Sequence, residues 1–199
     1  MKKISLLALG ITTAIFSFAQ TPAKFGLKGG VNISTIKIDD FDENDSRIGL
    51  HVGGLAHIHL SPQWALQPEL LYSTEGGKVD FGGGSEATYK NDYVNIPLMI
   101  QYMFDNGFRL EAGPQLGLMV NSEIEDEDGN EADADDTFKS TNVSVGFGLN
   151  YLSHSGLGVG GRYNLGVSNI AEGSGDAKGR VFQISLFYML DNAHKAKSK

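Results

Sequence analysis

The sequence contains no cysteine, so the folded protein has to be stable without disulfide bonds, and a lipid anchor attached to a cysteine is excluded. It has only 5 prolines and no linker rich in glycine and serine, so its 26 glycines, well above the usual share of about 7%, are expected in ordered structure. Beyond residue 19, no segment approaches the roughly 20 apolar residues of a membrane-spanning helix. The formal charge of −8 argues against nucleic acid as a partner.

The start of the chain, MKKISLLALGITTAIFSFAQ, combines two lysines, an apolar run over 4–18 and small residues near its end. This pattern predicts a secretory signal peptide over residues 1–19, cleaved after Ala19. The run is too short for a membrane anchor, which needs roughly 20 residues. We therefore expect the mature chain to leave the cytoplasm, with one domain over 20–190 and a polar tail over 191–199.

Residues 48–60, IGLHVGGLAHIHL, alternate between an apolar residue and a smaller or more polar one. Alternation with a period of two predicts a strand with one apolar and one polar face. Eight such segments follow one another, with no convincing amphipathic helix between them: 25–36, 48–60, 64–74, 93–104, 108–120, 141–151, 157–167 and 181–190. Pro68, Pro97 and Pro114 fall inside three of them, where proline removes a donor from the strand ladder.

The connections between these segments alternate in length. Three are tight and contain the turn formers Pro, Asn or Gly: 61–63, 105–107 and 153–156. Four are longer and polar: 37–47, 75–89, 121–139 and 171–179. Short turns at one rim and long loops at the other are typical of up-and-down antiparallel strands whose short turns face the periplasm.

Aromatic residues on the apolar face gather beside a tight turn or a terminus: Phe25, Trp64, Tyr102, Phe104, Phe108, Tyr151 and Tyr188. An up-and-down arrangement places them at one height, where they form a ring. Aromatic rings of this kind prefer the boundary between hydrocarbon and headgroups. This ring therefore indicates that the apolar face meets lipid.

The opposite face is rich in Gly, Ser, Asn and Gln and includes Lys28, Glu69, Arg109, Glu111 and Arg162. An eight-stranded barrel has an interior just wide enough to be filled by side chains, and charges inside it must be paired. In a soluble barrel of opposite polarity the same charges would be solvated outside, so charge alone does not decide. With the signal peptide and the loops, the pattern predicts an all-β fold, an eight-stranded antiparallel up-and-down transmembrane β-barrel. The alternative is a soluble periplasmic cup of the lipocalin type.

Four segments resemble the PorT-type, or porin-family, outer-membrane barrel domain of Bacteroidota: FGLKGGVNIS, WALQPELLYSTEGGK, YVNIPLMIQY and RLEAGPQLGLMV. The resemblance extends from Phe25 to Leu190 and implies an eight-stranded barrel in the cell outer membrane. It carries over no catalytic residues. The member that names the family is associated with export through the gliding-motility secretion system, so the resemblance also implies secretion-system proteins as partners. One departure is the tail DNAHKAKSK, because such barrels commonly end in an aromatic residue and here Tyr188 is internal.

Three histidines, His51, His57 and His59, share the polar face of their strand. His57 and His59 would stand about 7 Å apart and could converge on a metal ion, whereas His51 would lie about 20 Å away. No further ligand can be named for such a site. We therefore favour lumen histidines hydrogen-bonded to polar neighbours, and expect no metal and no cofactor.

The segment 121–138, NSEIEDEDGNEADADDTF, is densely acidic. Asp126, Asp128, Asn130 and Glu131 supply oxygen ligands that Ca²⁺ accepts, but Gly129 stands one place away from the glycine of an EF-hand loop. Divalent cations, or lipopolysaccharide bridged through them, are therefore candidate partners besides the membrane lipid. The favoured interpretation is a solvated, like-charged external loop.

Hydrolysis requires a nucleophile and a base within hydrogen-bond reach, and the sequence has no G-x-S-x-G and no histidine on the lipid face. His154 and Ser155 are explained by a turn. The segment 81–90, FGGGSEATYK, lacks the ending of a phosphate-binding loop and is expected to be a flexible loop. We therefore expect no catalytic residues, and a non-enzymatic barrel with a filled lumen and a structural or surface-interaction role. The alternative within the membrane is an accessory of transport or protein secretion.

Overall fold

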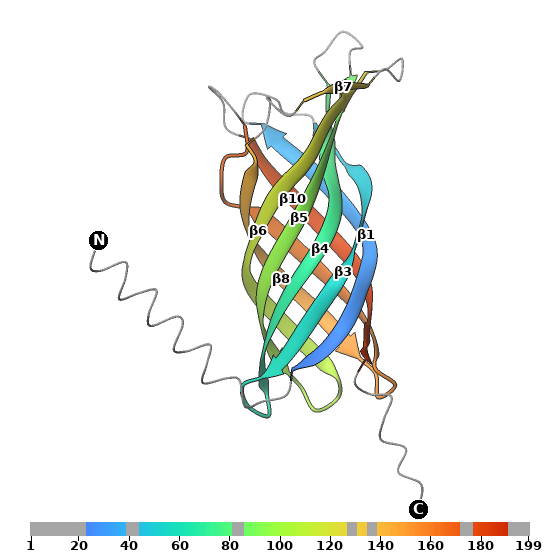
Figure 1. Cartoon of the computed structure of the whole chain (residues 1–199), viewed down its shortest axis with the longest axis vertical. Coiled ribbons are helices and arrows are strands. Elements are labelled where there is room, and N and C mark those ends of the chain that lie inside the picture. The colour runs from blue at the N-terminus through green and yellow to red at the C-terminus, as the bar shows by residue number, and fades with distance from the viewer. Residues whose placement is uncertain are drawn as a thin grey trace, which may run out of the picture.

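Eight long strands run up and down around one axis and enclose a narrow lumen (Figure 1). The computed structural model describes residues 23–38, 44–80, 86–126, 131–134, 139–171 and 177–190. The barrel strands are β1 (Lys24–Ile38), β3 (Arg47–His59), β4 (Trp64–Asp80), β5 (Glu86–Met103), β6 (Phe108–Glu125), β8 (Thr141–Leu152), β9 (Leu157–Gly166) and β10 (Ala177–Met189). The predicted eight-stranded antiparallel barrel is confirmed.

Every barrel strand pairs antiparallel with its neighbours in the chain, and β1 pairs with β10 to close the cylinder. The closing seam is long, because it runs from Gly26 opposite Met189 to Ile38 opposite Ala177. A closed cylinder leaves no barrel strand with a free edge, so the backbone groups are paired along the wall.

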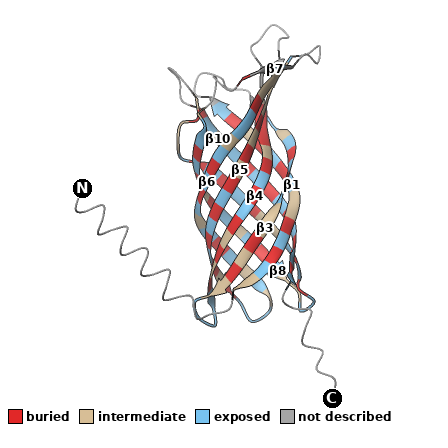
Figure 2. Ribbon diagram, viewed as in Figure 1, coloured by how far each residue is buried: buried red, intermediate tan, exposed pale blue. Residues whose placement is uncertain are grey.

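The apolar face of each strand points outward, as β3 illustrates. Ile48, Leu50 and Val52 are 76%, 63% and 62% exposed, whereas His51 and His57 are buried. Figure 2 shows the same alternation of exposed and buried residues over the whole barrel wall. A soluble cup requires the reverse polarity, with its apolar face inside, and does not fit this arrangement.

The tight connections 60–63, 104–107 and 153–156 lie together at one end of the barrel, here named the tight-turn rim, and the longer connections lie at the other end, the loop rim (Figure 1). The predicted aromatic residues gather at the tight-turn rim. Ring centroids lie 5.1 Å apart for Trp64 and Tyr102, and 5.2 Å apart for Phe108 and Tyr151. These contacts link β4 to β5 and β6 to β8 from the outside.

Two of the predicted loops are wrong in extent. β4 continues to Asp80 and β5 begins at Glu86, so most of 75–89 is paired strand, and β6 continues to Glu125 into the predicted loop 121–139. The segment 81–90, expected to be a flexible loop, contributes 86–90 to β5. Beyond the apolar band both faces of these strands are polar, so alternation stops while backbone pairing continues.

Two short strands were not predicted. β2 (Asn44–Asp45) pairs with β4, and β7 (Glu131–Asp133) pairs with β6, both at the loop rim. The predicted signal peptide and tail lie outside the described residues, as do 127–130 of the acidic segment. Within the part of the chain that the structure describes, no helix has the length and hydropathy needed to cross a membrane.

Candidate functional site

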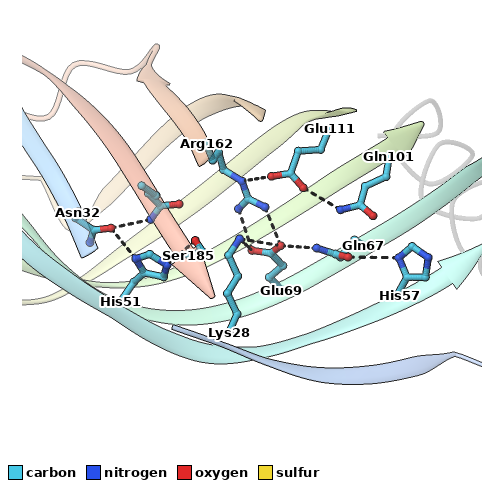
Figure 3. Close-up of polar contacts among 11 residues, drawn as sticks. Lys28, Asn32, His51, His57, Gln67, Glu69, Gln101, Glu111, Arg162 and Ser185 are labelled. Carbon is cyan, nitrogen blue, oxygen red and sulfur yellow. Dashed lines mark hydrogen bonds and ion pairs between the residues drawn. The ribbon is translucent and has the colours of Figure 1, made fainter. Parts of the chain in front are cut away.

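Four charged side chains from four strands meet in the middle of the lumen (Figure 3). Arg162 of β9 reaches across to β4, where its Nη1 and Nη2 lie 2.9 and 2.7 Å from the two carboxylate oxygens of Glu69. Its Nε donates to Oε1 of Glu111, on β6, at 2.6 Å. Lys28 of β1 adds its ammonium to Glu69 at 3.2 Å. Because side chains alternate along a strand, each strand can send one such group inward at this place.

This central cluster, Lys28, Glu69, Glu111 and Arg162, is electrically balanced and fully buried, with exposures of 2–4%. The fork of Arg162 on Glu69 is bidentate, which is the strong geometry for such a pair. Charges removed from water are tolerated only when they are paired and their remaining hydrogen-bonding positions are filled. Two amides supply that support: Gln67 donates to Glu69 at 2.8 Å, and Gln101 donates to the second oxygen of Glu111 at 2.9 Å.

Glycines make room for this cluster in the narrow lumen. A Cβ on Gly148 of β8 would lie 2.7 Å from Oε1 of Glu111, and one on Gly146 would lie 3.4 Å from Cδ of Arg162. Both glycines sit at lumen-facing positions. The glycine content of β8 therefore follows from the size of the charged groups that share its space.

His51 is hydrogen-bonded on both ring nitrogens, toward the loop rim from the central cluster (Figure 3). Nδ1 lies 2.8 Å from Oδ1 of Asn32, and Nε2 lies 2.9 Å from Oγ of Ser185. Gln183 also donates to Oδ1 of Asn32, so Nδ1 of His51 is the donor in its own bond. This network joins β1, β3 and β10 across the lumen.

His57 lies toward the tight-turn rim, with Nδ1 3.3 Å from Oε1 of Gln67. The favoured interpretation, lumen histidines bonded to polar neighbours, is thus confirmed for His51 and His57. The His57 and His59 rings are in contact, with centroids 4.7 Å apart and planes almost perpendicular. Lys24, directly opposite His57, and Arg109 bring positive charge to these rings. Among the described residues, no group of three His, Asp or Glu side chains could hold a metal ion.

Arg109 was predicted with the other lumen charges but does not join the central cluster. It lies on β6 beside the tight-turn rim and is only partly buried. Over the described ranges, it makes no hydrogen bond or ion pair. Alternation gives the face on which a residue lies, but not its depth in the barrel.

Two groups of apolar side chains also lie inside the barrel, one toward each rim, and the sequence pattern did not predict them. Leu55, Phe187 and Met189 pack together toward the tight-turn rim. Toward the loop rim, the apolar group consists of Ile36, Ile170 and Ala177, with Tyr89, Met119 and Ala171 packed against it. Phe187 and Met189 occupy polar-face positions of β10, and that is the signal by which they could have been found.

The other sequence candidates do not form a site. His154 and Ser155 lie in a tight turn, where Oγ of Ser155 pairs with Oγ of Ser153 at 2.7 Å. Of the acidic candidates, Asp126 is exposed, and Asp128, Gly129 and Asn130 lie outside the described residues.

Comparison with known proteins gives a family match and a set of structural likenesses. The family described as "Outer membrane protein beta-barrel domain" matches residues 18–172. Neisserial surface protein A is similar in structure, with a TM-score of 0.55 and 12% identity, over 84% of this chain and 98% of that chain. Ail, the attachment invasion locus protein of Yersinia pestis, in complex with the heparin analogue sucrose octasulfate, has a TM-score of 0.50 and 12% identity over the same shares. At these identities the likeness shows the fold alone. No curated protein matches the sequence.

Removing the cation at the centre of the cluster should destabilise the barrel strongly. Arg162→Met leaves Glu111 without a cationic partner, and we expect a loss of about 3–5 kcal/mol in the free energy of unfolding. The double variant Arg162→Met, Glu111→Gln removes one charge of each sign and keeps the Lys28–Glu69 pair, so it should lose less. Urea unfolding of the refolded barrel in detergent micelles measures both. Equal losses in the single and double variants would contradict the role given to charge balance.

Proposed function

This chain belongs to the family of outer-membrane β-barrel domain proteins, and from that premise we propose a non-enzymatic barrel whose lumen is closed by its own side chains and whose loop rim presents acidic segments outside the cell. The outer membrane is its location, so the outward apolar band of the wall is in contact with lipid. The aromatic residues of the tight-turn rim then lie at one edge of the hydrocarbon.

The observation that carries the closed lumen is the central cluster. Glu69 and Glu111 are both held by Arg162, and Lys28 fills the remaining side of Glu69. An ion or solute passing through would have to separate these buried pairs, and separating one partner of a buried pair costs about 3–5 kcal/mol. The apolar groups toward the two rims fill further parts of the lumen with side chains that cannot hydrate a passing ion.

The distribution of charge supports an outward loop rim with an electrostatic role. Nineteen of the 24 acidic residues fall in the segments 37–47, 75–89, 121–139 and 171–179. Longer loops of outer-membrane barrels face the exterior, and short turns face the periplasm. A rim of this charge attracts cations, so divalent ions and lipopolysaccharide bridged through them are the partners we propose. A sulfated ligand such as the one in the Ail complex would be repelled.

The finer assignment rests on the sequence. Residues 1–19 serve as the export signal in this proposal, 20–190 form the barrel domain, and 191–199 are a polar tail on the periplasmic side. The strand segments that resemble PorT-type barrels favour a PorT-type protein of Bacteroidota. This assignment carries an alternative function, that of an accessory of protein secretion.

Planar-bilayer recording tests the closed lumen. The wild-type barrel should give no steady current. A variant with Lys28, Glu69, Glu111 and Arg162 all changed to alanine stays charge-balanced but empties the middle of the lumen, so it should conduct more. Heat-modifiable migration on a detergent gel verifies that both proteins are folded barrels. A sizeable steady current through the wild type would reject the closed lumen and favour the transport alternative.

Cysteine labelling tests the orientation, because the natural chain offers no competing thiol. Ser140→Cys lies exposed at the loop rim, and His154→Cys lies exposed at the tight-turn rim. On intact cells, a maleimide coupled to a polymer too large for porins should label the first variant only. Permeabilising the outer membrane should add the second. Labelling of His154→Cys alone on intact cells would mean that the acidic rim faces the periplasm.

A further inference from the structure

Glu75 of β4 is a buried carboxylate that has no cation to balance it. It is 5% exposed, and its Oε1 accepts hydrogen bonds from Oγ of Ser73 at 2.9 Å and from Nδ2 of Asn95 at 2.8 Å. In the described part of the chain, no Lys, Arg or His forms an ion pair with it. The guanidinium of Arg47 is close, but it donates to the backbone carbonyl of Glu75. This differs from Glu69 and Glu111, which both pair with Arg162.

A small cavity adjoins this carboxylate inside the barrel. Its centre offers about 10 Å³ to a water-sized sphere, which is room for one water molecule or one ion. The polar residues that line it are Ser34, Thr35, Glu75, Asn91, Tyr93 and Asn142. The buried apolar residues Ile36, Ile170 and Val181 also line it.

Tyr93 supplies a second, independent sign of a missing occupant. Its side chain is 2% exposed, and over the described residues its hydroxyl has no hydrogen-bond partner. A buried hydroxyl left unpaired costs about 1–3 kcal/mol. Oδ1 of the neighbouring Asn91 already accepts a bond from Ser122 at 2.9 Å. The same cavity is thus lined by a residue with an unbalanced negative charge and by a residue with an unused oxygen.

We propose that this cavity binds one monovalent cation of the size of Na⁺, held by the Glu75 carboxylate and the Tyr93 hydroxyl. Every polar side chain around the cavity offers oxygen, which is the ligand atom that hard cations prefer. One carboxylate carries one negative charge, so a monovalent ion leaves the site neutral, whereas a divalent ion would leave a buried positive charge.

A proton or a water molecule would satisfy only one of the two groups, the Glu75 carboxylate or the Tyr93 hydroxyl. A proton on Glu75 removes the charge, but it provides no partner for the Tyr93 hydroxyl, which makes no hydrogen bond with the described residues. A water molecule pairs with Tyr93, but it leaves the charge. The acidic rim above the site raises the local concentration of cations and so favours its occupation.

The bound ion would link β4 to β5, a strand that contributes none of the four charges of the central cluster. Glu75 lies on β4 and Tyr93 on β5, and the lining Ser34 and Asn142 lie on β1 and β8. Sodium would therefore neutralise the Glu75 charge and connect Glu75 to Tyr93 in the half of the lumen nearer the loop rim.

Unfolding in matched salts tests the proposal on the full-length protein refolded in detergent micelles. Sodium chloride and choline chloride are compared at equal ionic strength. At a sodium concentration of about ten times the Kd of the site, the folded-to-unfolded ratio of the wild type should be about tenfold higher than in choline chloride. Glu75→Gln keeps the size of the side chain and removes the charge, so its stability should be the same in both salts. Tyr93→Phe removes one oxygen and should weaken the response.

Glu123→Gln is the matched control. Glu123 is a carboxylate near the loop rim, and it does not line the cavity. Its carboxylate accepts a solvent-exposed hydrogen bond from Asn121. It should keep the full sodium response. Broadening of the sodium NMR line by the wild type, absent with Glu75→Gln, gives a readout that does not depend on stability. A wild type equally stable in sodium and choline, or a sodium response that survives Glu75→Gln, would overturn the proposal. A stability that depends on pH but not on sodium would also overturn it, because Glu75 would then be neutralised by a proton.

Discussion

The demand that every backbone N–H and C=O find a partner away from water determines the form of this protein. In hydrocarbon no solvent can take over a missing hydrogen bond, so a sheet must close on itself. The pairing of β1 with β10 meets that demand. Closure in turn assigns the two faces of every strand, because side chains alternate: Ile48, Leu50 and Val52 contact lipid, and the intervening positions must fill a narrow interior.

That interior imposes a second demand, since its polar groups are as far from bulk water as the backbone is. The central cluster satisfies it by balancing two cations against two carboxylates and by placing Gln67 and Gln101 on the remaining oxygens. His51 is satisfied on both nitrogens in the same manner. Glu75 stands out because the side chains around it provide hydrogen bonds but no charge. Under the proposed function, an interior filled in this way makes the barrel a closed element of the membrane rather than a passage.

The sequence predicted the number of strands, their order and the faces of their residues, because alternation is a local property that each strand displays by itself. It could not predict that Arg162 would form ion pairs with Glu69 and Glu111, which are 93 and 51 positions away in the chain. Those contacts depend on the stagger of the strands around the cylinder. Arg109 shows the same limit, since its face was right and its depth was unknown. The extensions of β4, β5 and β6 were missed where both faces become polar. Phe187 was missed because a single apolar residue on the polar face has no evident packing partner in the sequence. Its partners are known only when the barrel is closed around it.

Apolar side chains point away from a closed cylinder and into lipid. Nitroxide labels on cysteines introduced at Leu50 and Leu98, which are 63% and 44% exposed on the outer wall, test this orientation most directly in lipid vesicles. Both labels should collide frequently with oxygen dissolved in the acyl chains and rarely with a water-soluble nickel chelate. Labels that meet the chelate freely and are shielded from oxygen would contradict this orientation.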